Sequence, residues 1–132
     1  MVSEKKEVLL EYNKYNECIT WGDEYRLEQA FQNLIVNAIY YTKPKGNVYV
    51  ELKSIDNIAY ISITDTGVGI SEADVDKIFD RYYRVSGTEK HQSTGLGLSI
   101  AQEIIKQHQG CISVKSELGK GTIFTVQLPV IL

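Results

Sequence analysis

The chain has little cysteine, no excess of either charge and no long apolar run. Cys18 and Cys111 stand far apart, with no CxxC motif and no histidine at zinc-ligand spacing, which favours a reducing compartment over a disulfide scaffold. The net charge of −3 comes without a long block of either sign, so nucleic acid is not suggested as a partner. No apolar run reaches the roughly 18 residues that span a bilayer, and residues 1–11 have no signal-peptide pattern. We therefore expect a cytoplasmic domain.

Length and composition are those of one domain. The 132 residues, 43% of them hydrophobic, are enough to bury a core without help from a metal or a disulfide, and they contain no internal repeat or low-complexity segment. We expect residues 1–132 to form a single domain.

Alternating apolar residues predict two hairpins, and three- to four-residue spacing predicts helices. The expected strands are residues 8–12, 18–21, 47–54, 58–65, 111–116 and 122–128. The expected helices are residues 24–42, which Asp23 should cap, residues 71–79, which Ser71 should cap, and residues 96–109. The apolar face of the last helix is expected to be Leu96, Ile100, Ala101, Ile104 and Ile105. Residues 84–93 hold almost no apolar side chains and predict a mobile lid. This order favours an α+β fold, a two-layer α/β sandwich in which about three helices cover one face of a mixed, mainly antiparallel sheet.

Asp65 ends the strand at residues 58–65 in an unusual position. Strand side chains alternate faces, so Asp65 continues the row of Ala59, Ile61 and Ile63 that should be buried. A buried carboxylate needs a donor from the protein, from water or from a ligand. The alternative is a turn former that hydrogen-bonds its own backbone, because Asp-Thr-Gly is common in turns. The segment alone leaves both interpretations open.

Two asparagines lie one turn apart on the margin of the apolar stripe of the helix at residues 24–42. Asparagine is a poor helix former, so Asn33 and Asn37 require an explanation. They could be surface residues or cap a neighbouring loop. Alternatively, their amide oxygens could coordinate a hard cation such as Mg²⁺, which keeps waters that phosphates can replace.

A glycine pair opens the helix that ends near residue 109. Gly95 and Gly97 leave backbone N–H groups accessible at a helix N-terminus, which favours phosphate binding, although glycine also permits close helix packing. His108 lies on the inward part of the same helix, and we expect it to be a packed or capping residue.

Five motifs in order now resemble one family. Asn33-Leu-Ile-Val-Asn37-Ala38 resembles the N box, and Asp65-Thr-Gly67-Val-Gly69 resembles the first glycine box. Three further motifs complete the series: the F box Phe79-Asp-Arg-Tyr-Tyr-Arg84, the second glycine box Thr94-Gly95-Leu96-Gly97-Leu98, and Gly119-Lys-Gly121-Thr122-Ile-Phe124. The series resembles the catalytic ATP-binding domain of bacterial sensor histidine kinases, in the wider group that includes gyrase, Hsp90 and MutL. The resemblance implies a Bergerat-type fold with a flexible ATP lid.

The resemblance also implies roles for individual residues. Asp65 would accept a hydrogen bond from the adenine amino group, Asn37 would bind Mg²⁺, and Asn33 would contribute to the metal or phosphate region. Tyr41 would pack near the adenine, and Arg84 would reach the phosphates. We take Asn37 and Arg84 as the catalytic candidates. The full set implied to bind ATP is Asn33, Asn37, Tyr41, Asp65, Gly67, Gly69, Ile70, Tyr83, Arg84, Thr94, Gly95, Leu96, Gly97, Leu98 and Thr122.

Two positions depart from or refine the family pattern. Tyr40 stands where many members carry Lys or Arg, a contact that Lys43, Arg81 or Lys90 could replace. Asn33 stands where the ATPases of the wider group have a water-activating Glu, and an amide cannot act as a general base. We expect ATP to be held for transfer rather than hydrolysed.

The function implied is that of a protein histidine kinase domain which presents the γ-phosphate of ATP to a histidine on a separate dimerisation domain. Neither His91 nor His108 has the sequence context of an acceptor, so this chain alone should not phosphorylate itself. The implied partners are that dimerisation and phosphoacceptor domain and a response regulator, within a full-length protein expected to be homodimeric and anchored in the cell membrane. The alternative is a nucleotide-binding regulatory module with weak or no phosphotransfer, for which Tyr40 is the hint.

Overall fold

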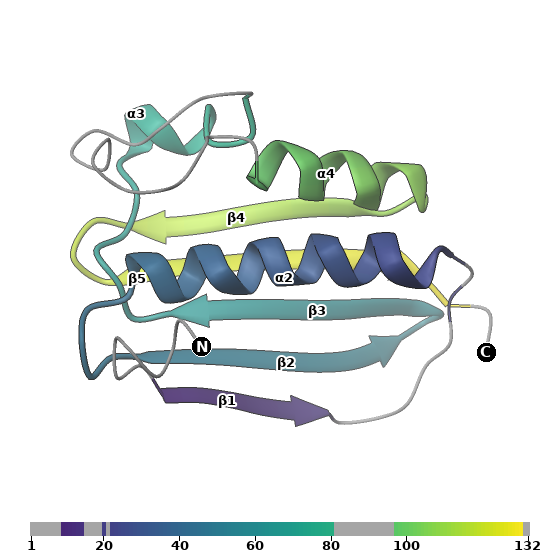
Figure 1. Cartoon of the computed structure of the whole chain (residues 1–132), viewed down its shortest axis with the longest axis horizontal. Coiled ribbons are helices and arrows are strands. Elements are labelled where there is room, and N and C mark those ends of the chain that lie inside the picture. The colour runs from purple at the N-terminus through teal and green to yellow at the C-terminus, as the bar shows by residue number, and fades with distance from the viewer. Residues whose placement is uncertain (1–8, 15–19, 21, 81–96, 131–132) are drawn as a thin grey trace.

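The computed structural model describes residues 9–14, 20, 22–80 and 97–130, and for residues 9–14 it describes the backbone. Five strands form one sheet in the order β1-β2-β3-β5-β4 (Figure 1). β1 runs parallel to β2, and the other neighbours are antiparallel. The strands are β1 (Leu9–Lys14), β2 (Asn47–Ile55), β3 (Ile58–Asp65), β4 (Cys111–Glu117) and β5 (Gly121–Pro129). The helices are α2 (Glu24–Tyr41), α3 (Glu72–Val75) and α4 (Gly97–Gln107). The predicted mixed, mainly antiparallel sheet with helices on one face is confirmed.

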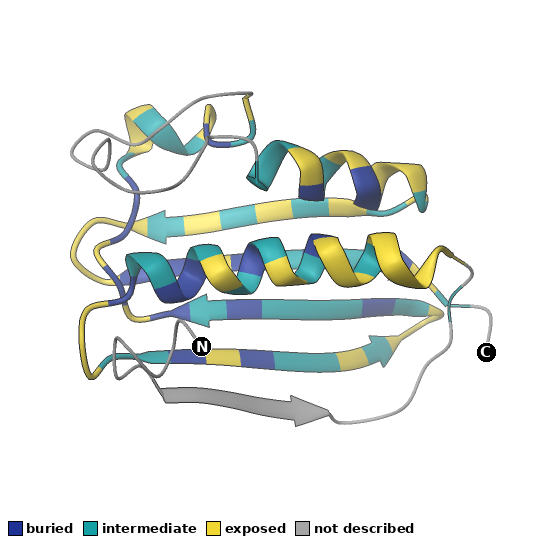
Figure 2. Ribbon diagram, viewed as in Figure 1, coloured by how far each residue is buried: buried dark blue, intermediate teal, exposed yellow. Residues whose placement is uncertain are grey.

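Alternation along the strands separates a covered face from an open one (Figure 2). In β5, buried residues alternate with less buried ones, and its partners in β3 follow the same parity. β2 and β3 are joined by Asp56 and Asn57, whose φ values of 52° and 66° form the left-handed two-residue turn that fits the twist of a hairpin. The hairpin predicted from the sequence is therefore present with its turn at the expected residues.

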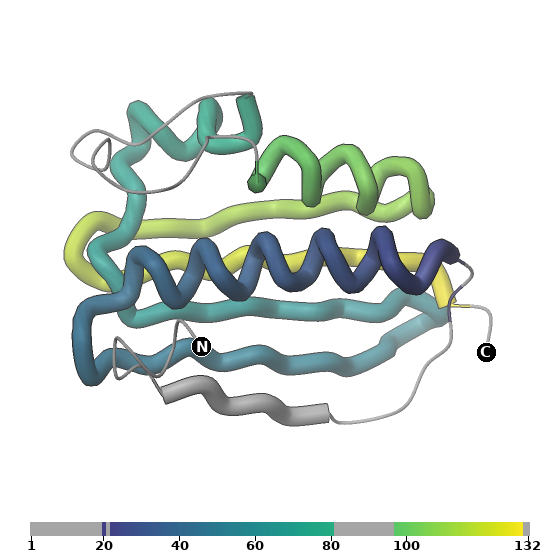
Figure 3. Tube along the Cα trace, in the orientation of Figure 1, coloured from purple at the N-terminus to yellow at the C-terminus, as the bar shows by residue number. Residues whose placement is uncertain are grey.

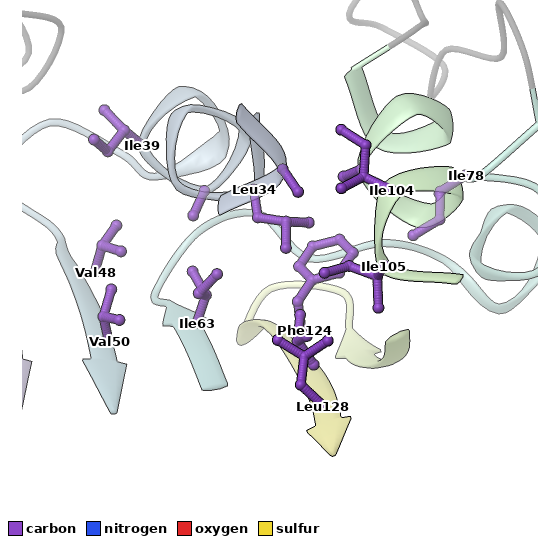
Figure 4. Packing of buried hydrophobic residues seen from close by; sticks show 14 of the residues in the cluster. Leu34, Ile39, Val48, Val50, Ile63, Ile78, Ile104, Ile105, Phe124 and Leu128 are labelled. Carbon is purple, nitrogen blue, oxygen red and sulfur yellow. The ribbon is translucent and has the colours of Figure 1, made fainter. Parts of the chain in front are cut away.

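The hydrophobic core lies between the sheet and α2 and α4. Figure 4 shows Leu34 of α2 and Ile105 of α4 directed toward the ring of Phe124 on β5. All three side chains are fully buried or nearly so. Burial of a large apolar side chain stabilises a fold by about 1.5–3 kcal/mol, so this layer supplies much of the driving force for folding.

α4 lies beside the N-terminal half of α2 and runs in the opposite direction (Figure 3). At one end of α4, the Nδ2 of Asn33 donates to the carbonyl oxygen of Gly97 at 3.2 Å. At the other end, the backbone N–H of Asp23 donates to Nε2 of His108 at 2.9 Å, while Nδ1 of His108 lies 2.8 Å from the carbonyl oxygen of Ile104. Because a backbone N–H can only donate, these contacts require the tautomer with hydrogen on Nδ1. His108 is thus a capping residue, as expected.

Asp23 begins α2 in the way the sequence predicts. Its Oδ1 accepts hydrogen bonds from the backbone N–H groups of Tyr25 and Arg26 at 3.0 and 3.2 Å, which satisfies two of the donors that a helix N-terminus leaves without partners. The carboxylate also suits the positive end of the helix dipole.

The predictions for two helices need correction. The short helix predicted over residues 71–79 is helical only at Glu72–Val75, because Lys77 and Asp80 bond carbonyls three residues back and form turns. Its predicted cap, Ser71, instead donates from Oγ to Asp74 Oδ2. In the predicted strand at residues 18–21, Thr20 belongs to no strand and the other three residues lie outside the described part of the chain.

The buried face of α4 consists of Ala101, Ile104 and Ile105, whereas Ile100, expected on that face, is 36% exposed. Ile100 lies at the margin of the stripe that these residues define. The helix ends at Gln107 rather than near residue 109, because Gln109 adopts a left-handed φ of 64° and Gly110 bonds back to the carbonyl of Ile105. Leu96 and the predicted lid at residues 84–93 lie outside the described residues.

Among the described helices, none combines the length and the apolarity that a bilayer crossing requires.

Candidate functional site

Asp65 is the buried carboxylate at the end of β3, as strand parity predicted. Asp65 is 4% exposed, and its Oδ1 accepts a hydrogen bond from the backbone N–H of Gly67 at 2.8 Å. Burial raises the pKa of Asp65 above 3.8, while hydrogen bonds from the backbone N–H groups of Gly67 and Thr122 act in the opposite direction. Both interpretations of this residue therefore hold at once, because it forms the local turn and it is also a desolvated carboxylate.

Three polar residues form one row across adjacent strands on the covered face. Asp65 pairs with Thr122 across β3 and β5, and Thr122 pairs with Ser116 across β5 and β4. Thr122 is 5% exposed. Direct cross-strand neighbours have Cβ atoms about 4.5–5.5 Å apart, so the three side chains form a contiguous polar patch at the end of an otherwise apolar face.

Ser116 was not among the residues predicted for the site. Its Oγ lies 2.6 Å from the backbone nitrogen of Ile70, 2.9 Å from the carbonyl oxygen of Gly121 and 2.8 Å from Thr122 Oγ1. It connects the end of the Asp65 loop to the turn between β4 and β5. The signal in the sequence was its inward parity in the strand at residues 111–116, on the same face as Ile112 and Val114.

The glycines of the Asp65 loop serve close contacts within the chain. A Cβ at Gly67 would come closer than 3.0 Å to the backbone of Tyr41, and one at Gly69 would come equally close to the backbone of Glu117. Gly69 also has a φ of +76°, which side chains rarely adopt. The structure thus gives both glycines a role inside the fold, and the approach of a nucleotide to them stays a prediction.

The C-terminal end of α2, the Asp65 loop and the β4–β5 turn meet at the same end of the molecule (Figure 1). The N–H of Val68 donates to the carbonyl oxygen of Tyr41 at 3.3 Å, and the N–H of Gly119 donates to the carbonyl oxygen of Val68 at 2.8 Å. The loop is therefore held from both sides by backbone hydrogen bonds.

Asn33 and Asn37 are both half-buried on α2, one turn apart. The amide nitrogen of Asn33 is committed to Gly97, so this residue connects α2 to the first turn of α4. Asn37 lies between Asn33 and Tyr41, one turn from each, and its amide oxygen is a hard donor of the type that Mg²⁺ prefers. A single protein oxygen fits a cation that keeps its remaining coordination for water and phosphate.

Gly97 differs from the glycines of the Asp65 loop. A Cβ built there meets no atom of the described residues within 4 Å. No contact within that part of the fold requires glycine at this position, and Leu98, the next predicted residue, packs partly against the core.

The predicted residues thus fall into two linked groups and an undescribed remainder. Asp65, Gly67, Ile70 and Thr122 belong to one hydrogen-bonded unit, in which Ser116 connects Ile70 to Thr122. Gly69 lies in the same loop, close to the backbone of Glu117. Asn33 and Gly97 form a second contact across the two helices, and Asn37 lies between these groups on α2. The predicted site residues Tyr83, Arg84, Thr94, Gly95 and Leu96 lie outside the described residues, as do Arg81 and Lys90.

This combination defines a class of protein, an α+β sandwich with a buried acceptor carboxylate at one end of its sheet. Residues 22–131 match the family described as histidine kinase-, DNA gyrase B- and HSP90-like ATPases. The chain belongs to this family, which includes the ATP-binding catalytic module of two-component kinases.

Sensor histidine kinases are found among its relatives. Sensor histidine kinase RppB of Synechocystis is 46% identical over 116 residues, which cover 86% of this chain and 26% of RppB. The mycobacterial sensor histidine kinase MprB has a similar structure, with a TM-score of 0.88 and 28% identity over 98% of this chain and 88% of that one. A structure of full-length ShkA in complex with AMPPNP has a TM-score of 0.84 and 27% identity, over 98% of this chain and 27% of ShkA. The chain spans about a quarter of the curated relative RppB.

Proposed function

We propose that this chain binds Mg-ATP and presents the γ-phosphate to a histidine on a separate dimerisation domain of a two-component sensor kinase. The observation that carries the proposal is the desolvated carboxylate of Asp65, held in a row of hydrogen-bonding side chains at the end of the sheet. Such an acceptor gains most from a ligand that donates a hydrogen bond, and the exocyclic amino group of adenine is a donor. A guanine base would instead direct a carbonyl oxygen at the same acceptors.

The remaining residues are assigned by their chemistry. Asn37 would bind Mg²⁺, which when bound neutralises charge on the phosphates. Tyr41 would pack near the base, and Gly97 would allow the triphosphate to approach the start of α4. Arg84, in the undescribed segment, would contact the transferred phosphate. Catalysis then rests on positioning the γ-phosphate for in-line attack by an imidazole.

Asn33 favours transfer over hydrolysis. An amide cannot take a proton from water, and its nitrogen donates to Gly97. The purified chain should therefore bind ATP without rapid steady-state release of phosphate. Sustained release at rates typical of an ATPase would contradict this part of the proposal.

We propose that the whole protein is a membrane-anchored homodimer whose cytoplasmic part includes this domain and which passes phosphate to a response regulator. The names of sensor-kinase relatives support this assignment. The acceptor is assigned to another domain because neither His91 nor His108 has an acceptor-like context, and His108 is committed to capping α2.

The decisive experiment combines the chain, ATP labelled on its γ-phosphate and a separately produced acceptor hairpin. Label should appear on the hairpin and should be absent from the chain incubated alone. ATP binding without any transfer would favour the alternative, a nucleotide-binding regulatory module, for which Tyr40 remains the hint. Label retained on His91 or His108 would contradict the assignment of the acceptor.

A further inference from the structure

Ser116 lies where three hydrogen-bonding groups converge on one hydroxyl. The group at 2.6 Å is the backbone N–H of Ile70, which can only donate, and the group at 2.9 Å is the carbonyl oxygen of Gly121, which can only accept. The third is the hydroxyl of Thr122 at 2.8 Å, in which either oxygen could be the donor.

Counting hydrogens removes that ambiguity. A serine hydroxyl has one hydrogen and two lone pairs. The hydrogen of Ser116 is used by Gly121, and one lone pair receives the N–H of Ile70. The other lone pair is the position left for Thr122, so the hydroxyl hydrogen of Thr122 points toward Ser116. The lone pairs of Thr122 Oγ1 then face away from Ser116.

This orientation bears on the Asp65 site because Thr122 is the direct cross-strand neighbour of Asp65. With its hydrogen held by Ser116, Thr122 offers an acceptor beside a carboxylate that is also an acceptor. Two adjacent buried acceptors favour a ligand group that donates and disfavour one that accepts.

We propose that Ser116 is a positioning residue that holds the hydroxyl of Thr122 as an acceptor and thereby sharpens selection of an amino-bearing over a keto-bearing purine. The inference rests on the proposed function, because it assigns Asp65 to base recognition. Ser116 acts on the ATP to GTP preference through Thr122 rather than by touching the nucleotide. Without it, the Thr122 hydroxyl could rotate and donate to a keto oxygen.

The test measures dissociation constants for ATP and GTP by titration calorimetry on the whole chain and on Ser116→Ala. The preference for ATP over GTP should fall about two- to tenfold, the effect of one neutral hydrogen bond. Ser113→Ala is the matched control, because Ser113 is an exposed serine of the same strand. Its ATP to GTP preference should equal that of the wild type.

The double variant Ser116→Ala with Thr122→Val shows whether Ser116 acts through Thr122. It should have the same preference as Thr122→Val alone. A merely structural role would weaken both nucleotides equally and leave the ratio unchanged, which would overturn the proposal.

Two other outcomes are also decisive. If Ser116→Ala does not fold by circular dichroism, Thr122→Val carries the comparison, because it keeps the backbone hydrogen bond to Asp65 and removes only the hydroxyl. A fall of about two- to tenfold in the ATP to GTP preference of Thr122→Val supports the inference, and an unchanged preference overturns it. If the wild-type chain binds neither nucleotide, the proposed function fails and this inference fails with it. If the wild-type chain binds ATP and Ser116→Ala has an unchanged ATP to GTP preference, only this inference fails.

Discussion

Asp65→Asn should separate nucleotide binding from folding. The amide has nearly the shape of the carboxylate, and its Oδ1 can still accept the N–H of Gly67 that now lies 2.8 Å away. The turn after β3 is therefore retained. The substitution removes a charged acceptor and places a donor where an adenine amino group is proposed to donate.

A hydrogen bond to a charged group contributes about 1.5–3 kcal/mol. Since each 1.4 kcal/mol is about tenfold in affinity, ATP binding should weaken by about 10- to 150-fold. Titration calorimetry measures the affinity, and urea unfolding followed by circular dichroism measures stability. The matched control is Asp56→Asn, the same chemical change at an exposed turn residue whose φ of 52° asparagine accepts. Unchanged ATP affinity in Asp65→Asn would refute the assignment and leave Asp65 as a turn former.

The same substitution should change how stability depends on pH. Because burial raises the pKa of Asp65 above 3.8, the native state binds this proton more tightly than the unfolded chain does. The contribution of Asp65 to stability is thus fully present below its unfolded pKa and is lost as pH rises through its folded pKa. An asparagine does not titrate, so the unfolding free energy of Asp65→Asn minus that of the wild type should increase with pH across this window. A difference that stays constant or decreases would show that burial does not disfavour the charged form.

Three further substitutions test the contacts around the site. Gly69→Ala should destabilise the chain by about 1–3 kcal/mol, because its Cβ would clash with backbone and its φ is left-handed, and urea unfolding will measure this. Gly97→Ala should leave stability unchanged or raise it by up to about 1 kcal/mol while weakening ATP binding in calorimetry, since its Cβ meets no described atom within 4 Å. His108→Ala should cost about 1 kcal/mol in the same unfolding assay, because the N–H of Asp23 loses its acceptor, whereas the exposed neighbour Gln107→Ala should cost less.

Each of these expectations has a contrary result. Wild-type stability in Gly69→Ala would show that the loop can relax away from Glu117. Wild-type ATP affinity in Gly97→Ala would argue against approach of the triphosphate at the start of α4. Equal losses in His108→Ala and Gln107→Ala would mean that the link between the two helices contributes nothing beyond local helix propensity.

Local periodicity was sufficient to predict the longer helices and strands. The alternation of residues 58–65 predicted both the strand and the inward direction of Asp65, and Asp23 was recognised as the start of α2. These features depend on spacings of two to four residues. The ends of α3 and α4 were predicted less accurately. They depend on whether the last helical turn is replaced by turns whose hydrogen bonds span three residues, as in α3, or by a left-handed residue, as in α4.

The motif order determined the family, and the sequence alone predicted that a buried carboxylate would need a partner. Only the tertiary structure decided which atoms surround the Asp65 carboxylate. Ser116 contacts Ile70 across a sequence separation of 46 residues, and His108 contacts Asp23 across 85. Hydrophobic periodicity cannot predict contacts between residues so far apart in the sequence. The glycines at 67 and 69 likewise owe their necessity to backbone from α2 and from the β4–β5 turn. The physical reason is that sterics and hydrogen-bond direction act between segments brought together by folding, whereas hydrophobic periodicity acts along the chain.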